Sequence, residues 1–97
     1  YPLKYEPDPR GVFRINVNHR EGVIEALYVG EKGELLIKSR SAEALSNYIV
    51  ENELVSTLSH AIYLGRELGK AEEALRIGKN YIQDQPLFTK KEALKLD

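Results

Sequence analysis

The spacing of apolar residues along this chain predicts strands in its first half and helices in its second. From Val12 to Asn18 apolar and polar residues alternate, and this period of two is typical of a half-buried strand. Val23 to Val29 is apolar on both sides apart from Glu25, which predicts a central strand. A third strand is expected at Glu34 to Lys38, and short turns containing glycine separate the three. The pattern therefore predicts an antiparallel meander.

Two helices follow, because the apolar period then changes to that of a helix. The first opens at Ser41, a good N-cap, and is expected to end at Asn52 in the left-handed conformation. The second is predicted to be one long helix. Ser56 can cap it, and its apolar stripe runs from Leu58 to Gly78 within a stretch that extends to Asp84.

The chain accordingly divides into three parts. Residues 1–11 contain three prolines and are expected to form an extended N-terminal strap or linker. Residues 12–84 are predicted to form a single α+β domain, a three-stranded antiparallel sheet packed on one face against two helices, the second long. Residues 85–97 are expected to form a C-terminal tail with a short helix, because Thr89 to Glu92 has the pattern of a capping box.

Composition narrows the classes of function. The net charge is -1, so nothing predicts binding to nucleic acid or to a membrane surface. Cysteine is absent, which excludes disulfides and thiolate chemistry. No apolar run approaches the roughly 20 residues of a membrane span, and no secretory or lipidation signal is present. A cytoplasmic location is the resulting expectation.

Methionine is also absent, so the chain is expected to be an excised piece of a longer protein or, less simply, a processed product. Charged residues make up 30% of the sequence, while Cys, Met and Trp are all missing. A high fraction of charged residues and a lack of Cys and Met are features of thermophilic proteins, so the composition predicts a thermophilic source.

Three residues that can make specific polar contacts lie on one flank of the long helix. His60, Tyr63 and Glu67 are spaced at i, i+3 and i+7. They could hydrogen-bond a polar heterocycle, but spacing alone favours a flank that docks on the sheet. His60 and Glu67 lie about 10 Å apart along the helix axis. We therefore expect no metal site.

Small residues recur at every fourth position of the same helix, at Ala61, Gly65 and Gly69. A glycine inside a helix costs about 1 kcal/mol relative to alanine. Close packing of a second helix or a sheet edge is favoured as the reason, ahead of close approach by a flat ligand ring. No phosphate loop or nucleophile elbow is present, so no catalytic residue is assigned and the domain is not expected to be an enzyme by itself.

Several motifs together resemble a known domain family. They are Pro7-Asp8-Pro9-Arg10-Gly11-x-Phe13, Ser41-Ala42, the stretch Leu54 to Leu75 with His60-Ala61-x-Tyr63-Leu64-Gly65-Arg66-Glu67-Leu68, and Tyr81-x-Gln83-Asp84. They resemble an uncharacterised archaeal and cyanobacterial domain family. That family is found with dihydropteroate-synthase-like proteins and with relatives of the A-type subunit of the tetrahydromethanopterin S-methyltransferase. The resemblance covers residues 7–84.

The resemblance implies an accessory, non-catalytic domain of a larger archaeal protein in tetrahydromethanopterin or folate-type one-carbon metabolism. Such a domain would contribute to pterin binding or to domain docking. The alternative is a protein-interaction or oligomerisation module with no small-molecule ligand. The expected ligand is a pterin such as tetrahydromethanopterin, and the expected partners are other domains of the parent protein or a second copy.

The resemblance also suggests which side chains would contact a pterin. The matching positions are His60, Tyr63, Arg66, Glu67, Tyr81 and Asp84. The Glu67 carboxylate would accept the paired N–H donors of the amino-pyrimidinone edge. Tyr63 or Tyr81 would stack on the ring, and Arg66 would meet a glutamyl or phosphate tail.

Overall fold

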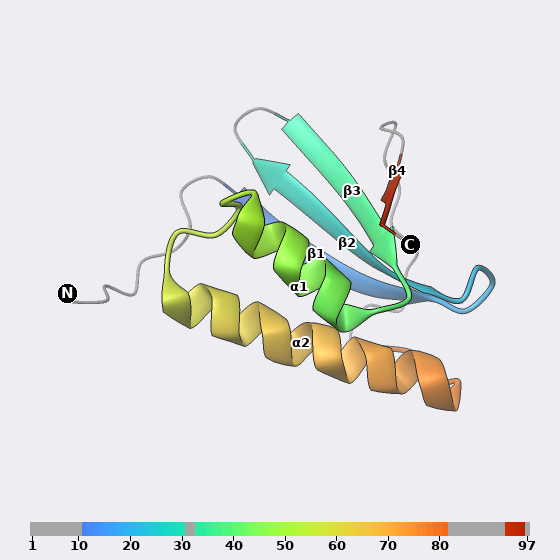
Figure 1. The fold of residues 1–97 in the computed structure, drawn as a ribbon. Helices are drawn as coiled ribbons and strands as arrows, with labels where there is room; N and C mark the ends of the chain where they lie inside the picture. Colours follow the sequence, from blue (N-terminus) through green and yellow to red (C-terminus); the bar gives the residue numbers. More distant parts are fainter. Residues whose placement is uncertain (1–10, 31–32, 82–92, 97) are drawn as a thin grey trace.

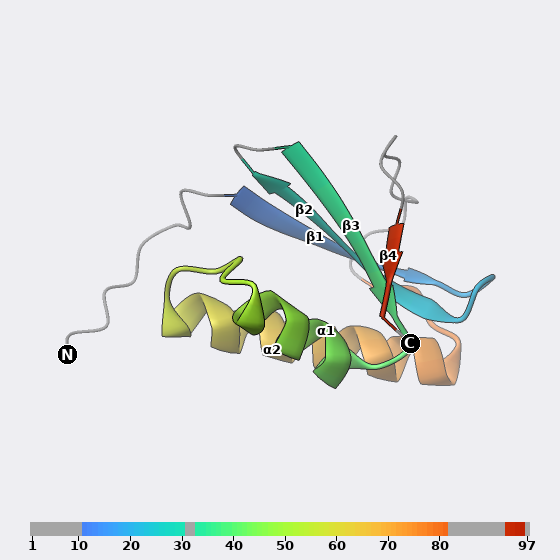
Figure 2. The ribbon, with the colours of Figure 1, turned by 45° about the horizontal axis from the view of Figure 1, so that its top comes forward.

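The computed structural model describes residues 11–30, 33–81 and 93–96. In chain order the elements are β1 (Gly11–Asn18), β2 (Val23–Gly30), β3 (Gly33–Ser39), α1 (Ala42–Glu51), α2 (Leu58–Ile77) and β4 (Ala93–Lys95). The two helices lie side by side on one face of a twisted sheet (Figures 1 and 2). The predicted α+β class, with two helices of which the second is long, is confirmed.

Within the described part of the chain, the sheet has four strands in the order β1-β2-β3-β4. The first three form the predicted antiparallel meander, in which Ala26 of β2 lies between Ile15 of β1 and Ile37 of β3. The fourth strand runs parallel to β3 and pairs Leu36 with Ala93. The sheet is therefore four-stranded and mixed, where three antiparallel strands were expected.

The same strand corrects the prediction for the C-terminal tail. Ala93–Lys95 pairs with β3, and the Leu96 N–H donates to the Lys38 carbonyl at 3.0 Å. The capping-box pattern at Thr89 to Glu92 lies outside the described residues. A capping box reports only local preference, whereas β4 is specified by a partner far away in the sequence.

The core lies between the helices and the sheet. Ile24 and Ile37 of the sheet, Leu45 of α1 and Leu68 of α2 have no exposed surface. Strand β2 is also buried on its other face, as predicted for a central strand, because Val23 is fully covered as well.

The first helix begins as predicted but ends differently. Ser41 Oγ accepts a hydrogen bond from the Ala44 N–H at 3.2 Å. Asn52 does not adopt the left-handed conformation; the next residue, Glu53, has φ 53°. The Glu53 and Leu54 N–H groups donate to the carbonyls of Val50 and Ile49, which is the hydrogen-bond pattern of a Schellman motif. The predicted end of the helix is therefore one residue early.

The second helix is shorter than predicted at its C-terminal end. Thr57, one residue after the expected cap, accepts the His60 N–H through its Oγ1 at 3.1 Å. The helix ends at Ile77 because Gly78 takes φ 78°, a conformation that glycine adopts without steric cost. Tyr81 therefore lies beyond the end of the helix. The expected continuation of the helix is wrong for residues 78–81, and residues 82–84 lie outside the described residues.

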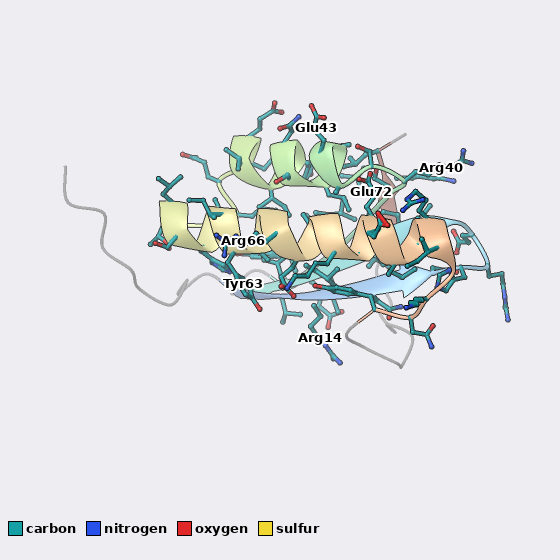
Figure 3. All side chains as sticks on the ribbon, turned by 90° about the horizontal axis from the view of Figure 1, so that it is seen from below. Arg14, Arg40, Glu43, Tyr63, Arg66 and Glu72 are labelled. Carbon is teal, nitrogen blue, oxygen red and sulfur yellow. The ribbon has the colours of Figure 1, made fainter. Side chains whose placement is uncertain are left out.

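The helices are joined by a hydrogen bond that acts as an additional cap. Glu72 of α2 reaches the start of α1, where its Oε2 accepts the Ala42 N–H at 3.1 Å (Figure 3). A carboxylate there satisfies a free N–H and interacts favourably with the helix dipole.

We expect Glu72→Ala to lower the free energy of unfolding by about 0.5–2 kcal/mol, the usual range for loss of a cap. Urea denaturation followed by circular dichroism would measure this change. Glu73→Ala is the matched control on the outward side of α2, and an equal loss in both variants would contradict the capping role.

Candidate functional site on the flank of α2

The centre of the predicted site is a buried hydrogen bond between Glu67 and Tyr81. Only 8% of each residue is exposed. The Tyr81 hydroxyl donates to Glu67 Oε1, and Lys70 Nζ lies 3.5 Å from Oε2. The segment that follows α2 thus turns back along the helix and brings the Tyr81 phenol into contact with the Glu67 carboxylate. Both side chains were predicted to face a ligand, and here they face each other.

The surroundings of Tyr81 raise the pKa of its phenol well above its usual value. Burial is the main cause, followed by the hydrogen bond to Glu67, the Glu67 charge and the Tyr63 phenol. Tyr81 therefore stays protonated and remains a donor to Glu67. The structure brings Tyr63, Glu67 and Tyr81 together, with Lys70 at their edge.

The other predicted ligand residues are placed differently. The His60 ring is half-buried and meets the Phe13 ring edge-on, with centroids 6.3 Å apart. Tyr63 is 57% exposed, and Arg66 is exposed as well; both extend from the first half of α2 (Figure 3). Asp84 lies outside the described residues.

The small residues of α2 do not share a single role. A Cβ at Gly65 would lie 3.7 Å from Ser46 Oγ, an ordinary contact, so this position faces α1. Gly65 and Glu67 differ by about 200° around the helix axis. A ring lying against Gly65 would therefore not reach the Glu67 flank. Ala61 is partly buried.

Gly69 has no such neighbour. It is exposed, and a Cβ built there meets nothing within 4 Å. Alanine would fit at this position and would lower the free energy of the helix by about 1 kcal/mol. Packing within the described part of the chain therefore does not account for this glycine.

A second polar cluster lies on the sheet face opposite the helices, and it was not predicted from the sequence. Glu25 is 6% exposed and accepts hydrogen bonds from Asn16 at 3.3 Å and Asn18 at 3.0 Å. Lys38 Nζ lies 3.8 Å from the same carboxylate. The sequence signal for this cluster was Glu25, a single acidic residue in an otherwise apolar strand. Its partners could be named only with the strand register, which pairs Asn16 and Lys38 with Glu25.

Lys38 also binds Glu21 of the β1–β2 turn, at 3.0 Å. This hydrogen bond and the lysine charge lower the pKa of the Glu21 carboxyl. A lowered pKa means that the pair contributes stability above the carboxyl's unfolded pKa and loses it as the pH falls through the folded value.

We expect Lys38→Gln to raise the pKa of Glu21 toward its ordinary value, because Lys38 supplies the two largest causes of the lowered pKa. A carbon-detected NMR titration of the glutamate side chains would measure it. Lys79→Gln is the control, and a Glu21 pKa that does not change in Lys38→Gln would contradict the assignment.

The β1–β2 turn is tied to the end of α2 by His19. Its Nε2 lies 2.8 Å from the Lys79 carbonyl and donates to it. His19 was expected in a turn, and it is exposed there. The contact fixes the hairpin beside the segment that carries Tyr81.

Among the described residues, no group of three or more His, Asp or Glu side chains is arranged to hold a metal ion. The helices in this part of the chain are too short or too polar to cross a membrane.

Comparison with known proteins places this sequence in a family. Residues 7–84 match the family described as PterinBD-DUF4346. An uncharacterised protein of Methanocaldococcus jannaschii is 39% identical over an alignment of 93 residues, which covers 89% of this chain and 18% of that protein. The uncharacterised protein ycf91 of Pyropia yezoensis is 38% identical over an alignment of 80 residues, which covers 75% of this chain and 68% of that protein. No solved structure matches the chain. The family match covers most of the sequence, including both helices and the Glu67–Tyr81 pair, and the chain belongs to the PterinBD-DUF4346 family.

Proposed function

We propose that this chain is an accessory, non-catalytic domain of a larger protein that handles a pterin, and that it acts through protein–protein contact. The link to pterins comes from the family's name. The place within a larger protein is suggested by the Methanocaldococcus jannaschii relative, of which the matching segment is 18%. The observation that carries the proposal is that Glu67 is buried against Tyr81 of its own domain.

This hydrogen bond leaves little of the predicted pterin site available. To accept the N–H donors of a pterin, Glu67 would have to give up the Tyr81 hydroxyl and become exposed. Leaving a buried hydrogen-bonding group unsatisfied costs about 1–3 kcal/mol. Tyr81 cannot stack on a ring while it is buried. Tyr63 and Arg66 remain exposed, but small-molecule sites are normally concave and enclose most of the ligand.

The outward side of the helices has the character of a contact surface. Leu58 and Ile62 of α2 are 50% and 51% exposed, and Val50 of α1 is 54% exposed. Ser46 faces Gly65, so the antiparallel helices bring the end of α1 beside the first turns of α2. Apolar side chains gathered on a surface in this way often mark sites of protein association.

We expect the chain to show no saturable binding of tetrahydromethanopterin, tetrahydrofolate or dihydropteroate in calorimetric and thermal-shift titrations. A ligand present at 100 times its dissociation constant would add about 2.7 kcal/mol of stability, so binding at that concentration would give a clearly measurable thermal shift. Tyr63→Ala runs in parallel, with the exposed Ser59→Ala as its control. Saturable binding that Tyr63→Ala abolishes and Ser59→Ala preserves would contradict the proposal and make this a pterin-contacting domain.

A further inference from the structure

The outward side of α2 carries a continuous row of exposed residues. Ile62, Arg66, Gly69, Glu73 and Ile77 fall within an arc of about 80° around the helix axis. All five are exposed, Ile62 at 51% and Ile77 at 47%. The residues that α2 buries, among them Leu64, Leu68 and Ala71, lie on the opposite side of the helix.

The row is symmetric about its midpoint in residue type, except that its two charged residues have opposite signs. Its midpoint lies between Gly69 and Lys70. Ile62 and Ile77 are equally far from that point, and so are Arg66 and Glu73. When two such helices pair antiparallel about a two-fold axis, each residue meets its counterpart on the other copy. Isoleucine then meets isoleucine at both ends, and arginine meets glutamate twice.

Gly69 lies where two such helices would approach most closely. Nothing in the described part of the chain requires a glycine there, because a Cβ would meet no atom within 4 Å. The separation of packed helices depends on the side chains at the contact, and glycine permits the shortest one. A second helix against Gly69 gives this residue a function that the single chain does not.

The charged groups around the row are compatible with this pairing. Glu73 is bound by Arg76 of its own helix through both carboxylate oxygens, and because it is exposed, an incoming arginine would share this carboxylate with Arg76. Arg66 makes no ion pair or hydrogen bond among the described residues. Lys70 is directed to Glu67 of its own flank at 3.5 Å, which turns its charge away from the midpoint.

We propose that two copies of this chain associate through α2, antiparallel, with Gly69 of each copy at the crossing point. The proposal rests on the proposed function, since it names the partner for the contact surface on α2. A single pair of helices buries less than the roughly 800 Å² per partner of a standard interface. The dimer is therefore expected to be weak, with a dissociation constant on the order of 10–100 µM for the chain alone.

Analytical ultracentrifugation of the full chain from about 5 µM to about 1 mM tests this, a range that spans the expected dissociation constant. The wild type should convert from monomer to dimer over that range. Arg66→Glu places two glutamates opposite each other and should weaken the dimer about tenfold or more. Combining it with Glu73→Arg restores opposite charges and should recover the dimer. Arg14→Glu is the matched control, because the strand register directs Arg14 to the sheet face away from the helices.

A second variant separates the interface from the fold. Gly69→Ala improves helix propensity, so the melting temperature of the monomer should rise while the dimer weakens. If Gly69 had a purely structural role, Gly69→Ala would change the melting temperature and the dimer affinity in the same direction. A monomer at about 1 mM, or a charge swap that fails to recover association, would overturn the pairing. A monomer that also binds no pterin would overturn the pairing alone, whereas saturable pterin binding would contradict the proposed function whatever the measured mass.

Discussion

Replacing Leu68 by alanine is expected to lower the free energy of unfolding by about 2–5 kcal/mol, the range for a leucine removed from a core. Leu68 has no exposed surface and belongs to the cluster that holds α2 against the sheet. The loss combines the transfer free energy of the missing methyl groups with the cost of the cavity left behind. It is a large part of the roughly 5–15 kcal/mol that stabilises a typical domain.

The same helix provides a control with the same chemistry. Leu58 lies in the first turn of α2 and is 50% exposed, so Leu58→Ala should change stability by no more than about 0.5 kcal/mol. Urea denaturation of both variants, with the slope and the midpoint fitted separately, measures the difference. Similar losses in the two variants would mean that α2 is not packed through its Leu68 side.

Removing either partner of the Glu67–Tyr81 hydrogen bond is expected to cost about 1–3 kcal/mol. Glu67→Ala leaves a buried hydroxyl without its acceptor, and Tyr81→Phe leaves a buried carboxylate with Lys70 as its remaining partner. The double variant should lose less than the sum of the two single losses, because both remove the same interaction. Additive losses would show that the two side chains are not coupled.

The raised pKa of Tyr81 adds a pH dependence to this prediction. Above about pH 10 the unfolded chain releases the phenol proton, while the folded chain still holds it. Stability is then fully present below the unfolded pKa and falls as the pH rises above it. Unfolding midpoints between pH 8 and about 11 should fall less steeply in Tyr81→Phe than in the exposed control Tyr63→Phe. Equal slopes would contradict a buried, protonated Tyr81.

The elements of this fold that could be predicted are those specified by neighbouring residues. Alternation at Phe13, Ile15 and Val17 predicted β1, and Ser41 marked the start of α1. Strand β4 could not be predicted, because its three residues carry no pattern of their own and depend on pairing with β3. The end of α2 was misplaced because the predicted helix was extended beyond Gly78, where its apolar stripe ends and where a left-handed glycine ends the helix.

The candidate site was predictable only as a set of positions on a helix. Spacing placed Tyr63 and Glu67 on one flank, which the structure agrees with, but it did not say what covers that flank. The cover is Tyr81, which was predicted to lie within the helix and instead folds back from beyond its end. The Glu25 cluster was missed for a related reason, since its partners come from neighbouring strands.

The pairing of β4 with β3 has a consequence for the order in which the sheet assembles. The meander and the pair of helices are built from contacts close in the sequence, which form quickly. Strand β4 closes a much longer loop for only three residues of pairing, so it should join last. Until then β3 is an open edge, and a strand from another newly made chain could occupy it. The tendency of this chain to aggregate would therefore be decided in the interval before β4 pairs with β3.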